Sequence, residues 1–327
     1  MTPHQRFAVE EASQVGEARR AAKAMAQDNG FDEVAAGRLA LAVTELGTNL
    51  VRHAREGAML FGRGAQGEID VVAWDRGPGM DLARCERDGF STAGSAGQGL
   101  GAARRAVDRF SAYSLPGRGT VIAARIRGAA PKEDASRFDV AALGLPAPGE
   151  RVSGDSWGER RDGNQLLLLL ADGLGHGVDA AVAADTAIAS LAETRTNSPA
   201  ELLQRAHESM RHTRGAAAAL VHCDADGLRF AGAGNICARL ISGVQDRSLM
   251  SQHGTLGVQI RRLQDMRYDW PAHAILVLHS DGIVTRWTID DAPGLLQCDP
   301  AVIAGWILRD HCRGRDDATV VVVKRRP

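Results

Sequence analysis

The sequence has no excess of charge of either sign. Its 327 residues include 39 Lys and Arg against 40 Asp and Glu, which gives a formal net charge of −1. A balanced chain has no electrostatic basis for binding nucleic acid or an anionic membrane surface. We therefore expect no nucleic acid and no membrane among its partners.

Long apolar runs and closely spaced cysteines are also missing. No apolar stretch approaches the roughly 20 residues that a membrane-spanning helix requires, and residues 1–10 do not resemble a secretory signal. The five cysteines are scattered, and none belongs to a C-x-x-C pair. This pattern argues against a structural zinc site or a disulfide framework. We expect a reduced, cytoplasmic protein.

A break in composition divides the chain. Between residues 127 and 150, Pro, Gly and charged residues occur without hydrophobic periodicity, as in a connecting segment. The length also favours two domains, because single cores rarely grow to this size. We predict a first domain over residues 1–127, a linker over 128–136 and a second domain over 137–327.

Both predicted domains have α+β character, with helices segregated from mainly antiparallel strands. In the first domain, helices are expected over 14–29, 32–56 and 100–110, and strands over 5–9, 58–62, 68–74, 111–115 and 120–126. In the second, one helix is expected over 178–193, and strands over 138–143, 152–157, 166–171, 216–223, 227–233, 238–242, 274–278 and 319–324. No internal repeat relates the two halves.

Acidic signatures follow one another down the second domain. They are centred on Asp155, Asp172-Gly173, Asp281 and Asp316-Asp317, and three of them adjoin an apolar, β-prone run. Carboxylates gathered at strand ends make oxygen sites for Mg²⁺ or Mn²⁺. The pattern therefore predicts metal-assisted hydrolysis. The alternative reading is a set of turn aspartates with glycine partners.

The first domain contains a different set of motifs. Glu45 and Asn49 lie one turn apart on the flank of a predicted helix whose buried stripe includes Leu39 and Leu46. Further along come the sequences Asp75-x-Gly77-x-Gly79, Gly97-x-Gly99-Leu-Gly101 and Gly119-Thr120. Glycines at the start of a helix let backbone N–H groups approach phosphates. Each element alone also fits a solvated helix face or an ordinary turn.

Taken in order, these motifs resemble the GHKL ATPases, and within them the small RsbT-like switch and anti-sigma serine kinases. The resemblance covers nearly all of residues 5–126. It implies an ATP site with Mg²⁺ held by Asn49, and Glu45 as the base that takes a proton from a serine or threonine hydroxyl. It also implies nucleotide-binding roles for Asp75 (adenine), Gly77, Gly79 (room for the base), Gly99 and Gly101 (phosphates) and Thr120 (adenine pocket).

The acidic signatures of the second domain resemble those of the metal-dependent PPM phosphatases, specifically the RsbX and SpoIIE-like group. Residues 230–236 and 253–257 match that group's intervening motifs. The resemblance implies a β-sandwich flanked by helices and two Mn²⁺ or Mg²⁺ ions that activate water. Asp172 would bridge the ions, and the other ligands would be Asp155, the Gly173 carbonyl, Asp281 and Asp316. His176 is either a general acid or a structural residue, and Asp317 either supports a ligand or is solvated.

Three functions fit these resemblances. The preferred one is a bifunctional regulator of a bacterial partner-switching or stressosome pathway, with an ATP-dependent serine/threonine kinase and an opposing phosphatase that act on STAS-domain proteins. The second is a phosphatase regulated by a non-catalytic ATP-binding domain. The third is an anti-sigma factor that binds a sigma factor. Retention of Glu45 favours the first function over the second, because binding alone does not require a carboxylate there.

Overall fold

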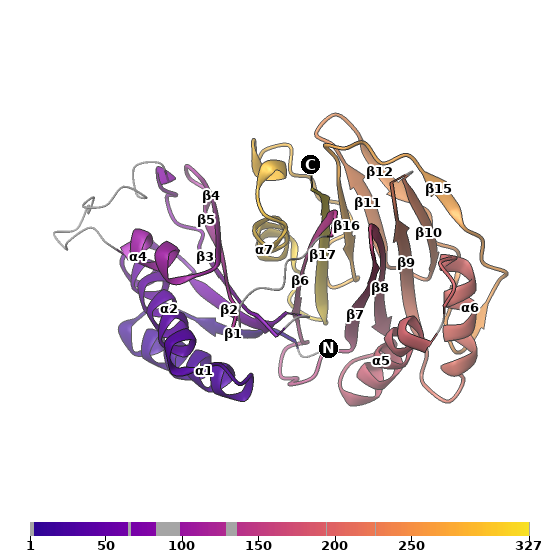
Figure 1. Ribbon diagram of the computed structural model, residues 1–327, viewed down its shortest axis with the longest axis horizontal. Helices are drawn as coiled ribbons and strands as arrows, with labels where there is room; N and C mark the ends of the chain where they lie inside the picture. Colours follow the sequence, from indigo (N-terminus) through magenta and orange to yellow (C-terminus); the bar gives the residue numbers. More distant parts are fainter. Residues whose placement is uncertain are drawn as a thin grey trace. The chain divides into compact units, whose positions relative to one another are not determined.

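The computed structural model describes residues 3–64, 67–82, 99–128, 136–193, 195–225 and 227–326. The chain forms two compact units (Figure 1). The unit that we call the N-unit comprises residues 4–133 together with 297–309, and the C-unit comprises residues 134–296 and 310–327 with the first three residues. Most of the predicted linker, residues 129–135, lies outside the described residues. Segment 297–309 groups with the N-unit although it comes from the second half of the sequence.

The N-unit is built on one antiparallel sheet with the strand order β1-β2-β3-β5-β4. Its strands are β1 (Gln5–Ala8), β2 (Ala58–Arg63), β3 (Ile69–Trp74), β4 (Arg109–Leu115) and β5 (Gly119–Ile126). Its helices are α1 (Ala12–Asp28), α2 (Glu33–His53), α4 (Gly99–Ala106) and α7 (Pro300–His311), of which the residues up to Arg309 belong to this unit.

Helix α4 is shorter than the sequence predicts. The expected helix over 100–110 is wrong in its last turn, because Arg109 and Phe110 pair with β5 as the first residues of β4. The sequence patterns do not predict helix α7. The other expected helices and strands of the N-unit are present, with ends that differ by a few residues.

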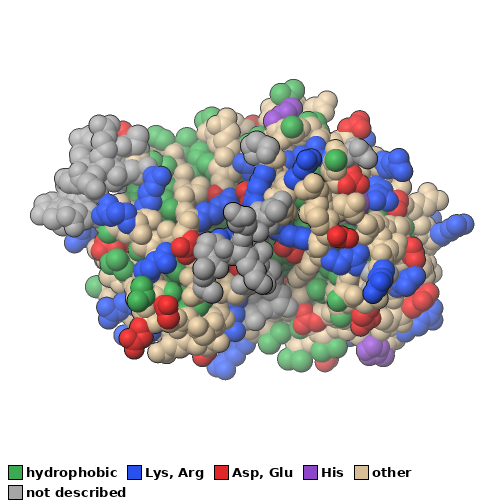
Figure 2. All heavy atoms as spheres, viewed as in Figure 1, with side chains coloured by type: hydrophobic (Ala, Val, Ile, Leu, Met, Phe, Trp, Pro, Cys, Tyr) green, Lys and Arg blue, Asp and Glu red, His purple; other side chains and the backbone are tan. Residues whose placement is uncertain are grey.

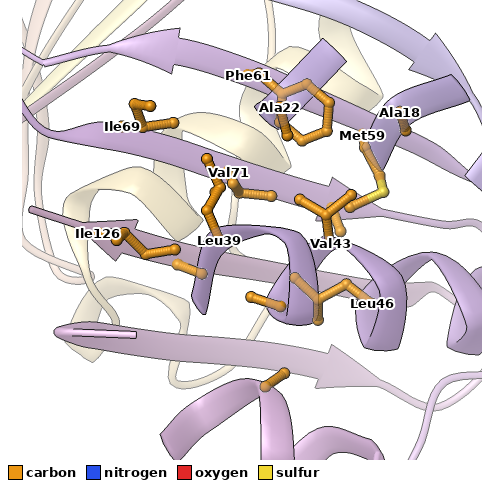
Figure 3. Close-up of a cluster of buried hydrophobic side chains, with 14 of the residues drawn as sticks. Ala18, Ala22, Leu39, Val43, Leu46, Met59, Phe61, Ile69, Val71 and Ile126 are labelled. Atoms are coloured by element: carbon orange, nitrogen blue, oxygen red, sulfur yellow. The ribbon is translucent and has the colours of Figure 1, made fainter. Parts of the chain in front are cut away.

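The core of the N-unit lies between the sheet and helices α1, α2 and α4. Figure 3 shows Leu39, Val43 and Leu46 of α2 directed at the sheet, opposite side chains that include Phe61 and Val71. Spacings of three and four residues place these α2 side chains on one face of the helix. The flank that carries Glu45 and Asn49 is only half-buried.

The C-unit is a sandwich of two five-stranded sheets with the orders β15-β10-β9-β8-β7 and β12-β11-β16-β17-β6. The first sheet contains β7 (Asp155–Asp162), β8 (Gln165–Gly173), β9 (Ala216–Cys223), β10 (Leu228–Ala233) and β15 (Met266–Tyr268). The second contains β6 (Phe138–Leu145), β11 (Cys237–Ile241), β12 (Asp246–Leu249), β16 (Ile275–His279) and β17 (Ala318–Arg325). The remaining elements are helices α5 (Val178–Glu193) and α6 (Pro199–Ser209), the 3₁₀ turn η1 (Leu295–Gln297) and the short pair β13 (Gly254–Thr255) and β14 (Gln259–Ile260).

The side chains of β8 point alternately to the two faces of its sheet, and this explains why the C-unit has a layer on each face. Leu166, Leu168 and Leu170 face the second sheet, whereas Leu167 and Leu169 face helices α5 and α6. Successive side chains of a strand point to opposite sides, so a strand buried on both sides reads as one apolar run. The predicted α+β fold, a β-sandwich with flanking helices, is confirmed, and the strand expected over 138–143 is present as β6 at the edge of a sheet.

One strand of the C-unit begins and ends later in the structure than the sequence predicts. The strand expected over 152–157 begins only at Asp155 and continues to Asp162. Before it the chain turns, since the Ser153 hydroxyl accepts a hydrogen bond from the Asp155 amide at 3.1 Å. The turn places Asp155 at the very start of the strand.

The described surface carries both signs of charge, as Figure 2 shows for one face. Among the described residues, no helix is both long and apolar enough to cross a membrane.

Candidate functional sites

Two acidic side chains face each other in the first sheet of the C-unit. Asp155 opens β7, Asp172 lies near the end of β8, and the two are register partners. Asp155 is buried and Asp172 is half-buried. The next residue, Gly173, donates its amide to the Gly154 carbonyl at 3.0 Å. A Cβ atom on Gly173 would overlap the Ala180 carbonyl of α5, so the tight packing there requires glycine.

The second sheet brings two further aspartates to the same place. Asp281 follows β16 after Ser280, and Asp316 precedes β17. The Ser280 hydroxyl joins the sheets, because it donates to Asp155 Oδ2 at 2.6 Å and accepts from the Thr319 amide at 2.9 Å. Sandwich packing therefore gathers acids that are far apart in the sequence.

These carboxylates lie near enough to influence one another's ionisation. Burial raises the pKa of Asp172, and the charges of Asp155, Asp281 and Asp316 raise it further. Burial also raises the pKa of Asp155, and its hydrogen bond from Ser280 opposes this rise only in part. Like charges held together out of water disfavour ionisation. The centre is therefore a site of concentrated negative charge.

The chemistry of these residues suits a divalent cation, although their side chains as placed in the described part of the chain do not form a group of three or more acidic, His or Cys residues that could hold a metal ion. The buried oxygens Asp155 Oδ1 and Asp317 Oδ2 accept no hydrogen bond from the described residues. Carboxylates that are crowded and incompletely hydrogen-bonded lack the positive charge that would compensate them. An all-oxygen set of this kind suits Mg²⁺ or Mn²⁺. We call this cluster, formed by Asp155, Asp172, Asp281 and Asp316, the acidic centre.

Asp317 and His176 are neighbours of the acidic centre in the sequence, and they differ in burial. Asp317 is buried rather than solvated, and its Oδ1 accepts the Ala147 amide at 2.8 Å. His176 is exposed, and its Nδ1 lies 2.7 Å from Glu150 Oε1. The role of His176 as a general acid therefore stays a prediction.

The N-unit contains a cluster of polar groups where β3 ends. Asp75 directly follows β3 and is buried, and its Oδ1 accepts the Gly77 amide at 2.6 Å. Burial raises the pKa of Asp75, whereas the Gly77 hydrogen bond, the Arg309 charge and hydrogen bonds with Thr120 act against that rise. The carboxylate is thus buried yet surrounded by groups that stabilise its charged form.

Thr120 belongs to the same polar cluster and comes from the neighbouring strand β5. Its carbonyl accepts the Asp75 amide at 3.0 Å, and its hydroxyl lies 2.9 Å from the Ser114 hydroxyl. Ser114 also accepts the Met80 amide at 2.8 Å. Gly79 has φ of +76°, and a Cβ there would press on the Leu115 backbone. The predicted residues Asp75, Gly77, Gly79 and Thr120 therefore lie together.

A second group of predicted residues meets between α2 and α4. A Cβ built on Gly99 would lie 3.1 Å from Glu45 Oε2 and 3.6 Å from Asn49 Oδ1. The start of α4 therefore approaches the polar flank of α2, where backbone N–H groups and the helix dipole favour an anion. Gly101 lies within α4. The two preceding residues of the glycine motif, Gly97 and Gln98, lie outside the described residues.

Sequence reasoning missed several residues that support these sites. Ser280 stands beside a predicted ligand, and its hydroxyl was the available signal. Asn235 belongs to the motif over residues 230–236, and its amide donates to Asp281 Oδ2 at 2.8 Å. Ser114 and Arg309 gave no local signal, because their partners come from other elements.

Comparison with known proteins gives matches for both halves of the chain. Residues 7–126 match the histidine kinase-like ATPase domain, and residues 162–326 match Stage II sporulation protein E, SpoIIE. The serine/threonine-protein kinase RsbT of Bacillus subtilis (strain 168) is 37% identical over 112 residues, which cover 33% of this chain and 84% of RsbT.

Solved structures resemble the second half. One, reported for the bacterial stressosome as a modular system adapted to control secondary messenger signaling, has a TM-score of 0.53 and 28% identity, and the match covers 57% of this chain and 99% of that one. RsbX in complex with magnesium has a TM-score of 0.51 at 19% identity, over 60% and 98% of the two chains, which supports the fold alone. The chain therefore belongs to the SpoIIE family of PPM-type phosphatase domains through its second half, joined to a histidine kinase-like ATPase domain of the RsbT family.

Proposed function

We propose that this protein is a bifunctional regulator, an ATP-dependent serine/threonine kinase joined to a metal-dependent phosphatase of phosphoserine and phosphothreonine. The observation that carries the proposal is the acidic centre, where Asp155 and Asp172 of one sheet meet Asp281 and Asp316 of the other. The placement of Glu45 beside Asn49 and Gly99 supports the kinase half.

The acidic centre would hold two Mn²⁺ or Mg²⁺ ions through Asp155, Asp172, the Gly173 carbonyl, Asp281 and Asp316. Such ions, when bound, lower the pKa of water and neutralise the phosphate oxygens. The chain's own contribution is to fix the carboxylates. Ser280 orients Asp155 and Asn235 orients Asp281, so that each ligand keeps one direction. In the hydrolysis, the oxygen of water would form a bond to phosphorus as the bond from phosphorus to the serine or threonine oxygen of the substrate breaks, which releases inorganic phosphate and leaves the free hydroxyl on the substrate.

The kinase site would bind ATP with Mg²⁺. Asp75 would accept a hydrogen bond from the adenine amino group, next to Gly77, Gly79 and Thr120. Asn49 would hold Mg²⁺, and the amides near Gly99 and Gly101 would contact phosphates. Glu45 would take the proton from the attacking hydroxyl while the γ-phosphoryl group moves to that oxygen and ADP leaves. Such transfer depends mainly on positioning and charge neutralisation.

The proposed targets are STAS-domain proteins of a bacterial partner-switching or stressosome pathway, with a sigma factor or other regulator downstream. RsbT is a serine/threonine-protein kinase, and one similar structure was reported under a title on the bacterial stressosome. A kinase and a phosphatase in one chain are present in equal amounts and at high local concentration near a shared substrate. Together they would set the fraction of substrate that is phosphorylated.

The test measures that fraction with the full chain. Candidate STAS proteins from the same organism are incubated with ATP, Mg²⁺ and Mn²⁺, and their phosphorylation is read on a phosphate-affinity gel. Asp172→Asn should leave the substrate mostly phosphorylated, and Glu45→Gln should leave it mostly unphosphorylated. Wild type should lie between them.

The two other readings predict different gels. If Asp172→Asn phosphorylates no candidate while wild type dephosphorylates one, the first domain binds ATP without transferring phosphate. If no variant changes any candidate but the chain binds a sigma factor, the protein is an anti-sigma factor. Either result would overturn the bifunctional assignment.

A further inference from the structure

Arg214 of the C-unit lies just before β9, beside the loop that follows two of the proposed metal ligands. Strand β8 ends in Asp172 and Gly173, which pair with the first residues of β9. The contact between the two chains continues one step beyond the strands, because the Leu174 amide donates to the Gly215 carbonyl at 2.9 Å. Arg214 is the next residue outward. The backbone pairing therefore places a cation at the edge of the acidic centre.

The Arg214 guanidinium is exposed and held by an exposed partner. Its Nη2 donates to Asp179 Oδ2 in the first turn of α5 at 2.5 Å, and the two side chains are 53% and 64% exposed. A Cβ built on Gly175 would lie 3.5 Å from Nη1, so the guanidinium extends along the loop after β8. Ion pairs on the surface contribute little to stability. The cation can therefore exchange Asp179 for a partner of higher charge at little cost.

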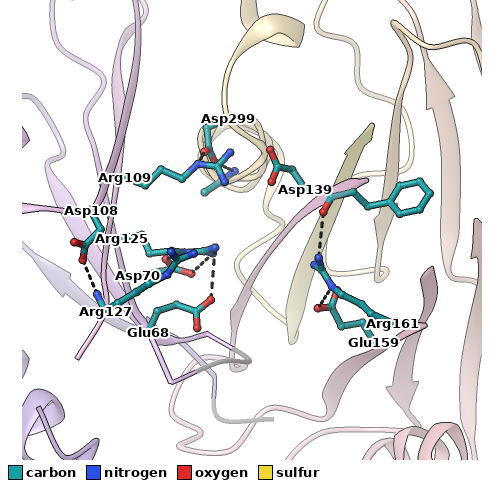
Figure 4. A network of polar contacts seen from close by, with 12 residues as sticks. Glu68, Asp70, Asp108, Arg109, Arg125, Arg127, Asp139, Glu159, Arg161 and Asp299 are labelled. Carbon is teal, nitrogen blue, oxygen red and sulfur yellow. Dashed lines mark hydrogen bonds and ion pairs between the residues drawn. The ribbon is translucent and has the colours of Figure 1, made fainter. Parts of the chain in front are cut away.

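Arg161 of β7 shows how an arginine with a structural role is held in the same unit. Its guanidinium donates to both carboxylate oxygens of Glu159, at 2.8 and 3.2 Å, and to the Phe138 carbonyl at 3.2 Å (Figure 4). The Arg161 side chain is only 22% exposed. Arg214 is bonded to its carboxylate through one nitrogen and is more exposed. Its planar set of donors is therefore accessible to a ligand with several acceptor oxygens.

The charge of the acidic centre gives a reason for a cation at this place. Two divalent ions would bring four positive charges, which the four carboxylates of the centre would cancel. A phosphate ester of serine or threonine carries about two negative charges at neutral pH. Further positive charge beside the centre would compensate them, and a guanidinium matches phosphate oxygens in geometry as well as in charge.

Three exposed apolar side chains surround Arg214. Leu174 is 47% exposed, and Val178, at the start of α5, is 66% exposed. Val258, in the turn between β13 and β14, is 62% exposed, and its Cγ2 would lie 2.8 Å from a Cβ on Gly215. We call these three side chains the apolar rim. Exposed apolar groups that border a polar site are typical of surfaces that bind another molecule.

We propose that Arg214 binds the phosphate group of the substrate, and that the apolar rim binds apolar side chains next to the phosphorylated residue. The proposal rests on the proposed phosphatase function and specifies its substrate class, a phosphorylated protein segment with apolar flanking residues. When the segment binds, the guanidinium exchanges Asp179 for two phosphate oxygens. A small phosphate ester would use Arg214 alone, because it has no side chains to cover the rim.

The experiment measures hydrolysis by the full chain in saturating Mn²⁺. The probes are para-nitrophenyl phosphate and two phosphoserine peptides that differ only in having leucine or serine on both sides of the phosphoserine. Wild type should have a lower KM for the leucine peptide than for the serine peptide. Arg214→Ala should raise the KM for all three probes about tenfold, the effect of losing a charge-assisted hydrogen bond. Its kcat and its calorimetric affinity for Mn²⁺ should stay within a few-fold of wild type.

Variants of the apolar rim separate the two parts of the proposal. Val178→Ser and Val258→Ser should each raise the KM for the leucine peptide about threefold, because they remove apolar contact area. Neither should change the KM for para-nitrophenyl phosphate. Val244→Ser is the matched control, since Val244 is 89% exposed in the turn between β11 and β12. Equal KM values of wild type for the two peptides would overturn the role of the rim and leave the phosphatase function intact.

Asp179→Asn distinguishes a phosphate contact from a structural ion pair. It removes the partner but keeps the cation, so its KM values should equal those of wild type or be lower. A rise as large as that of Arg214→Ala would show that the ion pair only supports the start of α5, and would overturn the phosphate contact. Arg205→Ala, which removes an exposed arginine paired with Glu201 on α6, should behave as wild type.

Two further outcomes would also contradict the proposal. Arg315 is the competing cation, because its charge acts on Asp281. A raised KM in Arg315→Ala, with none in Arg214→Ala, would assign the phosphate contact to Arg315 instead. No hydrolysis of any probe by wild type would overturn the phosphatase function itself, and the role of Arg214 with it.

Discussion

Asp155 on β7 and Asp172 on β8 are register partners, and the backbone pairing of the two strands holds their carboxylates close together. Burial raises the pKa of both; the Asp155 charge raises that of Asp172 further, and the charges of Asp317 and Asp281 raise that of Asp155. A carboxyl group whose pKa is raised on folding favours the folded state at low pH, and this contribution is lost as the pH rises through the raised pKa. Without metal, the acidic centre therefore opposes folding at neutral and higher pH.

The first prediction concerns this pH dependence. In excess chelator, the melting temperature of the wild type should fall as the pH rises from the ordinary aspartate pKa of about 4 through the raised pKa values. Asp172→Asn should flatten the decline by removing one interacting charge, at about 1.4 kcal/mol for each unit of pKa shift removed. Thermal unfolding at a series of pH values checks this. Parallel curves for the two proteins would contradict it.

Metal addition is the second arm of the same prediction. Mn²⁺ or Mg²⁺ should raise the melting temperature of the wild type more at pH 8 than at pH 5, because ionised carboxylates bind the cation and stabilise the folded state. Asp172→Asn should show a much smaller rise. An equal rise in both proteins would place the cation elsewhere.

The second prediction concerns Ser280, whose hydroxyl bridges Asp155 and the Thr319 amide. Ser280→Ala should weaken Mn²⁺ binding tenfold or more, because second-sphere partners that orient a ligand typically contribute that much. Ser280→Thr keeps the hydroxyl and is the matched control. Calorimetric titration of Mn²⁺ gives the affinities, and equal values for Ala and wild type would exclude the orienting role.

Much of this fold follows from local sequence patterns. Apolar runs such as 166–170 predict strands buried on both sides, and the spacing of Leu39, Val43 and Leu46 predicts the buried face of α2. Motif order also predicts that the acidic signatures belong to one site. Their meeting depends on strand register and sheet packing, which no local pattern specifies.

Helix α7 shows where prediction from local sequence patterns fails. Residues 301–308 are all buried and almost all apolar, so the helix has no polar face to reveal a period of 3.6. An apolar run of this length also fits a strand. The contacts of Arg309 with Asp75 and Arg76 join residues more than 230 positions apart, and neither partner gives a local signal for them.

The third prediction separates nucleotide binding from phosphoryl transfer. Asp75→Asn should weaken ATP binding at least tenfold, because the amide cannot reproduce both the hydrogen bond from Gly77 and the one proposed from adenine. Glu45→Gln should keep ATP affinity within a few-fold of wild type yet abolish transfer, since it removes only the proton acceptor. Calorimetry and radiolabel transfer measure the two quantities. Loss of ATP binding in Glu45→Gln would contradict its role as a base.

The fourth prediction concerns Trp306, which is buried against Tyr113 and supports the guanidinium of Arg309. Trp306→Ala should lower the free energy of unfolding by about 3–5 kcal/mol, as expected for removal of a large buried aromatic side chain. Trp306→Phe keeps an aromatic ring beside Tyr113 and should cost much less. Denaturant unfolding of the full chain measures both. Because Arg309 stacks on this ring, Trp306→Ala should also weaken binding of a non-hydrolysable ATP analogue. A variant that loses stability but binds the analogue as wild type would limit α7 to a packing role.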